Sequence, residues 1–169
     1  MGVDMDMMIM RDDGAVVMKD MFLGRDYDWF DKLQMYGSEE IYEDFLPAFS
    51  GIPSFSPEEL QRVYTEYKNE GCYGFHFMKV EDYLNWYDTY KPNINAGWVS
   101  AYEKWKIERR HWKPDYLSRY RPEDAEPDDA FFVECEVLCH DTEIVEQIRD
   151  NEDVMRDKGR YWIVYYFTC

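Results

Sequence analysis

The segment that most constrains the fold is RYWIVYYFTC at residues 160–169, which is apolar in nearly every position. Alternate residues of a β-strand point to opposite faces of its sheet. Here both sets of alternate residues are apolar, so both faces of the strand must be covered. The sequence therefore predicts a central strand with packed layers on either side.

Three other regions predict the layers around this strand. Residues 1–20 alternate apolar and acidic positions before a turn-forming Asp-Asp-Gly, which predicts a β-hairpin. Residues 56–112 form a helix-rich middle, and the Ser56 hydroxyl is expected to cap its first helix. Residues 131–169, which follow an acidic linker at 121–130, predict a strand, a helix and a strand.

These elements indicate the α+β class. Strands and helices intermix without the regular alternation of a parallel α/β fold, so we expect a mixed sheet with several packed helices. The chain has 169 residues, the size of one domain, and we expect a single domain spanning 1–169.

The net charge restricts the classes of partner. Nineteen Lys and Arg stand against 36 Asp and Glu, which leaves −17. A surface this acidic repels DNA, RNA and anionic membranes and attracts basic proteins. The N-terminus carries aspartates where an export signal needs positive charge, and the four cysteines then indicate reduced thiols. We therefore expect a soluble cytoplasmic protein that binds neither nucleic acid nor membranes directly.

Two acidic clusters are the candidate surface for a basic partner. Carboxylates on a folded scaffold can imitate a phosphate backbone and occupy a nucleic-acid-binding cleft, although acidic loops are more often simply solvated. The residues are Glu39, Glu40, Glu43, Asp44, Glu123, Asp124, Glu126, Asp128 and Asp129.

The segment 98–121 departs from this acidic character. It holds seven Lys and Arg against three carboxylates, and its aromatic residues recur every three or four positions. We expect one helix over 97–112 with a single aromatic stripe. Such a stripe is a candidate site for an anionic aromatic ligand. We favour the alternative that its aromatic residues pack in the core and its cations pair with the protein's own carboxylates; the charge division could also direct homo-oligomer formation. The stripe comprises Trp98, Tyr102, Trp105, Arg109 and Trp112.

Signals for catalysis are sparse. Asp4 and Asp6 point to one face of the predicted hairpin and are candidate Mg²⁺ ligands of a hydrolase or transferase, but a solvated face explains them as well. Cys135 and Cys139 would sit too far apart on a strand for one zinc ion. The chain carries none of the common nucleotide-binding, metalloprotease or serine-hydrolase motifs. The sequence thus favours a non-enzymatic role without catalytic residues, metal or cofactor.

The opening MGVDMDM, the crowding of Tyr, Trp and Asp, and the small acidic format resemble proteins encoded by bacteriophages. The resemblance implies a viral protein in the bacterial cytoplasm that turns off a host or defence function. The leading hypothesis is an acidic binding protein that docks on, and inhibits, a basic protein that handles nucleic acid. The alternatives are a small-molecule or nucleotide-binding protein that uses the aromatic stripe, and the metal-dependent enzyme.

Overall fold

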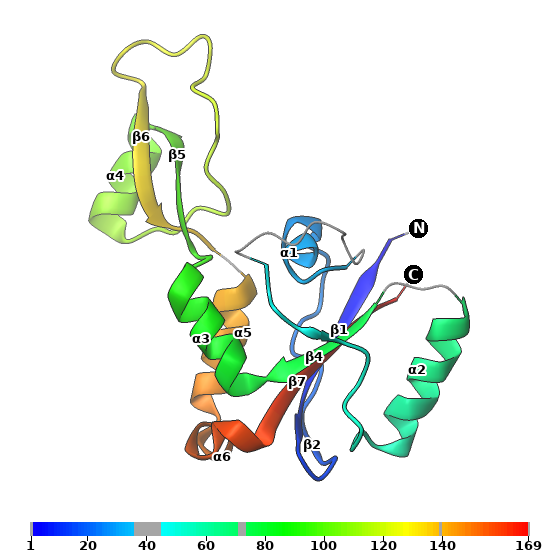
Figure 1. The fold of residues 1–169 in the computed structure, drawn as a ribbon. Coiled ribbons are helices and arrows are strands. Elements are labelled where there is room, and N and C mark those ends of the chain that lie inside the picture. Colours follow the sequence, from blue (N-terminus) through cyan, green and yellow to red (C-terminus); the bar gives the residue numbers. More distant parts are fainter. Residues whose placement is uncertain (1, 36–44, 71–73, 139, 169) are drawn as a thin grey trace. The chain divides into compact units, whose positions relative to one another are not determined.

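The computed structural model describes residues 2–35, 45–70, 74–138 and 140–168, and the chain divides into two units (Figure 1). Unit 1 comprises Met1–Tyr90 and Ile144–Cys169, and unit 2 comprises Lys91–Glu143. Helices and antiparallel strands occur in both units, which confirms the α+β class. The expectation of a single domain stays a prediction.

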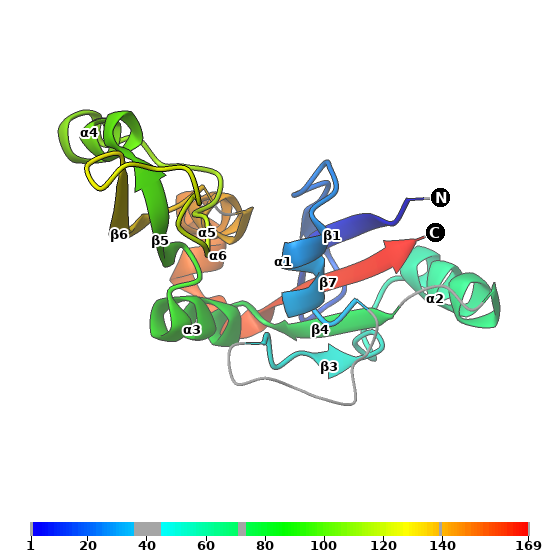
Figure 2. The same cartoon turned by 90° about the horizontal axis from the view of Figure 1, so that it is seen from above.

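Unit 1 is built on a five-stranded sheet in the order β2-β1-β7-β4-β3, of which Figure 2 shows the last four strands side by side. The C-terminal strand β7 lies in the middle, as its two-sided apolarity predicts. All described pairings are antiparallel, so the expected mixed sheet is wrong in this respect. The strands are β1 (Asp4–Arg11), β2 (Val16–Met18), β3 (Phe49–Ser50), β4 (Phe75–Lys79) and β7 (Tyr161–Thr168).

Helices cover both faces of this sheet. On one face, Ile163, Tyr165 and Phe167 of β7 belong to a large buried cluster. That cluster includes residues of α1 (Tyr27–Lys32), α3 (Val80–Tyr90), α5 (His140–Asp150) and α6 (Glu152–Arg156). On the other face, Val164 packs with Met10 and with Leu60 of α2 (Glu58–Glu70). The central strand is therefore buried on both sides.

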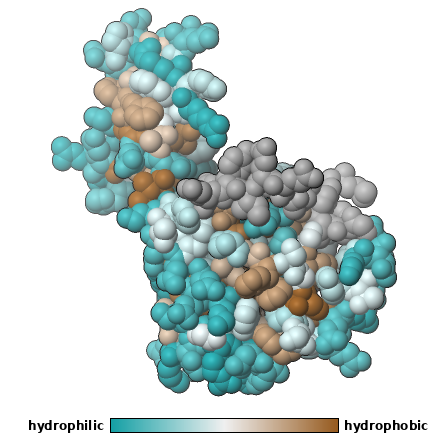
Figure 3. Space-filling view, in the orientation of Figure 1, coloured by the Kyte–Doolittle hydropathy of each residue, from teal (hydrophilic) through white to brown (hydrophobic). Residues whose placement is uncertain are grey.

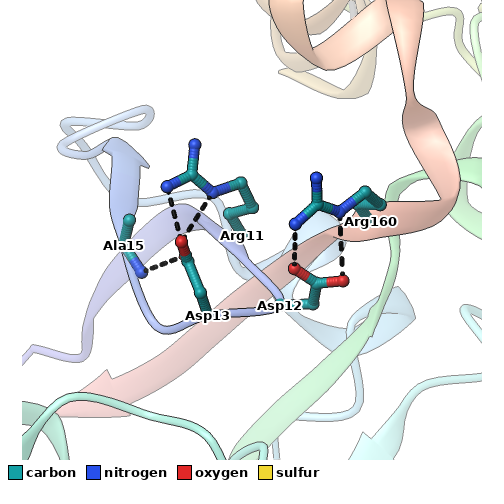
Figure 4. A network of polar contacts seen from close by, with 5 residues as sticks. All are labelled: Arg11, Asp12, Asp13, Ala15 and Arg160. Atoms are coloured by element: carbon teal, nitrogen blue, oxygen red, sulfur yellow. Dashed lines mark hydrogen bonds and ion pairs between the residues drawn. The ribbon is translucent and has the colours of Figure 1, made fainter.

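The predicted N-terminal hairpin is confirmed, with β1 and β2 joined through residues 12–15. Gly14 has a φ of +88°, and a Cβ there would lie 2.6 Å from the Phe55 carbonyl oxygen, so glycine is required at this turn. Asp13 accepts hydrogen bonds from Arg11 and from the Ala15 backbone, and Asp12 pairs with Arg160 (Figure 4). Arg160 is the last residue of the 3₁₀ turn η1 (Lys158–Arg160) and directly precedes β7. The Asp12–Arg160 ion pair therefore connects the hairpin turn to the start of β7.

The expected cap of α2 is wrong in detail. The helix begins at Glu58, two residues beyond Ser56. The Ser56 hydroxyl donates to the Pro53 carbonyl at 2.6 Å, so it stabilises the preceding turn rather than accepting from the first helical amides.

Unit 2 contains a two-stranded antiparallel sheet of β5 (Ile94–Ser100) and β6 (Ala130–Glu136), with α4 (Ala101–Arg110) between them in sequence. The predicted helix over 97–112 is therefore wrong at its start, because residues 97–100 are strand. Ser100 caps α4 in a reciprocal capping box with Glu103. The predicted order strand, helix, strand over 131–169 is confirmed, although β6 and β7 belong to different sheets.

Candidate functional site

The acidic candidates of unit 2 lie on an exposed loop immediately before β6. Throughout the described chain, these five side chains form no ion pair, although Arg121 donates to the Glu126 backbone carbonyl. The loop residues are Glu123, Asp124, Glu126, Asp128 and Asp129. Glu39, Glu40, Glu43 and Asp44 lie outside the described residues.

The predicted aromatic stripe is divided over three elements. Trp98 lies on β5, Tyr102, Trp105 and Arg109 lie on α4, and Trp112 follows the C-cap of that helix. The C-cap residue, His111, has a φ of +52°, which ends the helix before Trp112. The five residues therefore do not form one helical face.

The three stripe residues on α4 are exposed rather than core. Tyr102 and Trp105 are 66% and 45% exposed, and their rings stack with centroids 6.0 Å apart. Lys106 lies over the Tyr102 ring and Arg110 over the Trp105 ring. We call Tyr102, Trp105, Lys106, Arg109 and Arg110 the aromatic–basic helix face. Figure 3 also shows apolar side chains exposed on the visible face of unit 2.

The other two stripe residues, Trp98 and Trp112, meet in a hollow of about 400 Å³, which we call the unit 2 pocket. Both side chains are half-buried. The pocket is lined by Trp98, Val99, Ser100, Glu103, Trp112, Pro114, Asp115, Tyr116, Ser118, Pro122, Asp129 and Ala130. It thus joins the strands, the start of α4 and the beginning and end of the acidic loop.

A close backbone approach forms one wall of the pocket. The Trp98 amide donates to the Ser118 carbonyl at 2.8 Å, which holds the segment around Ser118 beside β5. This approach depends on Gly97, because a Cβ there would lie 2.6 Å from the Leu117 Cβ. The Trp98 ring is braced edge-to-face by Phe132, its partner across the sheet.

The charged groups that line the pocket are all carboxylates. Glu103 is partly engaged, since its carboxylate accepts from the Ser100 amide in the capping box. Asp115 and Asp129 are exposed and form no ion pair in the described part of the chain. No Lys or Arg is among the described lining residues. The pocket therefore combines aromatic walls with two carboxylates, Asp115 and Asp129, that form no ion pair with the described residues.

Two cations of unit 2 already lie over the aromatic walls. The Lys106 ammonium is 3.7 Å from the centroid of the Trp112 ring, and the Arg121 guanidinium is 6.0 Å from that of Trp98. Such contacts are favourable because the ring faces carry negative charge density. Both tryptophans thus have faces that accept cations.

Sequence reasoning did not single out three residues of this site, Glu103, Asp115 and Tyr116. One signal was available, because Ser100 and Glu103 have the spacing of a capping box, which indicates a helix that begins after Ser100. A helix that begins after Ser100 leaves Gly97 and Trp98 outside it, in a strand. The interpretation of residues 98–112 as one helical stripe would then have been rejected. Asp115 and Tyr116 carry no such signal, because only the fold brings them to Trp98.

The candidate metal ligands Asp4 and Asp6 share the exposed face of β1, but Asp4 already has a partner. Arg25 donates to both Asp4 oxygens, at 2.7 and 3.3 Å, and this hydrogen bonding holds the pKa of Asp4 below its usual value. A cation at Asp4 would have to displace the guanidinium. Over the residues that the structure describes, no group of three His, Cys, Asp or Glu side chains is placed to hold a metal ion.

Two further reactive side chains, Cys135 and His76, are poorly suited to catalysis. Burial, with the nearby Glu136 charge, raises the pKa of the Cys135 thiol and reduces its thiolate fraction. His76 of β4 is buried, and neither ring nitrogen has a hydrogen-bond partner within the described residues. Burial lowers the pKa of His76, and the ring stacks on Tyr165. Cys72 and Cys139 lie outside the described residues.

Charge is unevenly distributed between the units. In unit 2, eight Lys and Arg stand against twelve Asp and Glu, which leaves −4, so −13 of the net charge of −17 belongs to unit 1. Cations are also more frequent in the sequence of unit 2 than in that of unit 1. None of the described helices has the length and apolar character needed to cross a bilayer.

The comparisons with known proteins add no further assignment. No protein-family model, curated protein or solved structure matches this chain, so the candidate site rests on its own geometry.

Proposed function

We propose that this protein is a non-enzymatic binding protein that docks through unit 2 on a basic protein that handles nucleic acid, and inhibits it. The observation that carries the proposal is the exposed acidic loop, whose five carboxylates have no cation partner among the described residues. Exposed carboxylates without an ion-pair partner cost little free energy in water. They contribute most to the free energy of binding when a partner protein supplies cations to pair with them.

The charge distribution supports the same kind of partner. The −13 of unit 1 adds a long-range attraction for a basic protein, which accelerates encounter at low salt. Clustered carboxylates present the partner with a charge pattern similar to that of a phosphate backbone. The partner's nucleic-acid cleft is therefore the surface that this loop would occupy, and the bound nucleic acid would be displaced.

A capture experiment tests this proposal. The full chain is immobilised and exposed to a bacterial lysate at 50 mM salt, and retained proteins are released with duplex DNA and identified by mass spectrometry. We expect basic nucleic-acid-handling proteins, and their loss with the variant E123Q/D124N/E126Q/D128N. The four substitutions remove loop charges that do not line the unit 2 pocket. If wild type and variant retain the same proteins, the loop is not the docking surface and the proposal is wrong.

A second candidate function is the binding of a small anionic aromatic ligand such as a nucleotide. The supporting observation is the aromatic–basic helix face, where the Tyr102 and Trp105 rings are exposed beside three cations. A base would stack on Trp105 and a phosphate would pair with Arg109 or Arg110. Tryptophan fluorescence titrated with nucleotides tests it: a change that Trp105→Ala abolishes supports this function, and an unchanged signal excludes it.

A further inference from the structure

We propose that the unit 2 pocket binds an arginine side chain of the basic partner. The inference rests on the proposed function and deepens it, because it names the group on the partner that the pocket recognises. It also assigns separate roles to two sets of carboxylates: the loop residues 123–128 provide general attraction, and the pocket carboxylates provide specific contacts.

The lining of the pocket selects a cation. Trp98, Trp112 and Tyr116 supply aromatic surface, and Asp115 and Asp129 supply carboxylates that lack a partner in the described chain. Anionic ligands such as nucleotides would be repelled by these carboxylates. An uncharged apolar group would bury aromatic surface but leave both carboxylates without a counter-charge. A cationic group would both cover the aromatic surface and supply a counter-charge to the carboxylates.

The aromatic walls favour guanidinium over ammonium. A guanidinium is planar, stacks on aromatic rings and donates paired hydrogen bonds that match a carboxylate. A lysine ammonium is more strongly hydrated and cannot make the same planar contact. The volume of about 400 Å³ is at the lower end of the range for small-ligand pockets, which suits one long side chain rather than a folded peptide.

The chain's own cations support the assignment. Arg121 lies over the ring of Trp98 and Lys106 over that of Trp112, so both tryptophans already take part in cation–π contacts within unit 2. These groups do not line the pocket. A partner arginine would add a second cation to an aromatic wall, or replace Arg121 on Trp98, and in both cases the pocket carboxylates would supply the counter-charge.

The test uses the full ¹⁵N-labelled chain and three acetylated, amidated peptides, Gly-Gly-X-Gly-Gly with X as Arg, Lys or Gln, monitored by NMR. We expect the Arg peptide to shift the indole resonances of Trp98 and Trp112, assigned with W98F and W112F, and the Lys peptide to bind more weakly. The Gln peptide should cause no shift. Shifts of the same size with the Gln peptide, or a Lys peptide that binds as tightly as the Arg peptide, would overturn the assignment.

A matched pair of variants separates pocket recognition from general attraction. D115N/D129N and E123Q/D124N each remove two exposed carboxylates, but only the first pair lines the pocket. We expect D115N/D129N to weaken Arg-peptide binding about tenfold, that is by about 1.4 kcal/mol, because it removes both carboxylates that would accept hydrogen bonds from the guanidinium. E123Q/D124N should change it less than twofold. Equal effects of the two pairs would show that charge alone acts and that the pocket has no role.

Failure of this inference and failure of the proposed function give different results. If only the pocket assignment is wrong, the Arg peptide leaves both indoles unshifted while the lysate capture still depends on the loop carboxylates. If the proposed function is wrong, the capture is unaffected by loop substitutions, whatever the peptides do. Because Asp115 and Asp129 are exposed, their amide variants should fold, and unchanged backbone resonances of β5 and β6 would confirm it.

Discussion

The two units place their aromatic and apolar side chains differently. Unit 1 buries them in one large cluster around β7, in which Phe30, Tyr83, Tyr165 and Phe167 are fully enclosed. In unit 2 the buried hydrophobic residues of the described chain are Val99, Ala130 and Val137, all small. Unit 2 also holds seven of the thirteen large hydrophobic residues that the described chain exposes.

The difference indicates what each unit's sequence is used for. Large aromatic side chains contribute most to stability when they are buried, and unit 1 uses them in this way. Exposed Trp, Tyr and Arg are instead the residues that contribute most at binding interfaces. Unit 2 is maintained mainly by backbone pairing of β5 with β6, by the capping box and by the close approach at Gly97. Four predictions test this comparison.

The largest effect is expected from a matched pair of Phe→Ala substitutions on strands. Phe167 of β7 is fully buried against Phe30, so Phe167→Ala should destabilise the protein by about 3–5 kcal/mol through the cavity it leaves. Phe132 of β6 is 61% exposed, so Phe132→Ala should cost less than about 0.5 kcal/mol. Urea unfolding of both variants measures this. A comparable loss in the two would contradict the contrast between the units.

The next effect should be confined to unit 2. Gly97→Val places side-chain carbon against Leu117 and the Ser118 carbonyl, and we expect a cost of about 1–3 kcal/mol from this overpacking. The pocket wall should move, and the Arg peptide should no longer bind. Gly159→Ala is the control, since the nearest atom to its new Cβ is at an ordinary 3.5 Å. NMR spectra should show changes in unit 2 with the unit 1 core resonances retained; loss of both sets together would mean that the units do not respond separately.

A smaller, pH-dependent effect should arise in unit 1 from His76. Its pKa is lowered by burial, so the unfolded chain binds a proton more readily than the folded one. Above the ordinary pKa of 6.5, the His76 ring is neutral in both states and the fold keeps its full stability. As pH falls from 6.5 toward the lowered pKa, the free energy of unfolding decreases by up to about 1.4 kcal/mol per pH unit. His76→Leu should reduce the slope of unfolding free energy between pH 7 and 5.5. An unchanged slope would show that groups other than His76 cause the pH dependence.

The smallest effect is expected at the hairpin turn. The hydrogen bond from Arg11, and then that from the Ala15 amide, lowers the pKa of Asp13 to about 2. The ionised Asp13 carboxylate therefore adds to the free energy of unfolding above pH 3.8, its ordinary pKa. This contribution is lost as pH falls toward 2. Because both side chains of the pair are solvent-accessible, Asp13→Asn should change stability only slightly. NMR titration should give a midpoint near 2 that rises in Arg11→Gln; a midpoint near 3.8 in wild type would contradict the contact.

Much of unit 1 could be predicted from the sequence because its signals are local and redundant. The two-sided apolarity of residues 160–169 defines a central strand, and Gly14 between two apolar segments defines the hairpin. The antiparallel direction of all pairings was not accessible, because it depends on which distant strands meet. The prediction of the Ser56 cap was wrong because the sequence does not show which neighbour the hydroxyl contacts, and in the structure it donates to the Pro53 carbonyl.

The candidate site of unit 2 was less predictable. A spacing of three and four residues from Trp98 to Trp112 fits a helix, yet it also fits a strand followed by a helix, and the capping box at Ser100 decides between them. The pocket forms only because Trp98 and Trp112 approach each other through the turn at His111 and because Gly97 admits Leu117. Neither contact leaves a periodic signal in the sequence.

The central position of β7 has a consequence for biosynthesis. Both β1 and β4 use β7 as their neighbour, and β7 starts roughly 150 residues after β1 ends, a delay of roughly 8–30 s at common translation speeds of about 5–20 residues per second. Until β7 has emerged from the ribosome, the methionine-rich β1 has an open edge that other nascent chains can pair with. Its two aspartates, Asp4 and Asp6, place carboxylates on the exposed face of β1, and charged side chains on an open strand disfavour its pairing with other chains. They would thus protect the unfinished protein from aggregation during the interval before its sheet is completed.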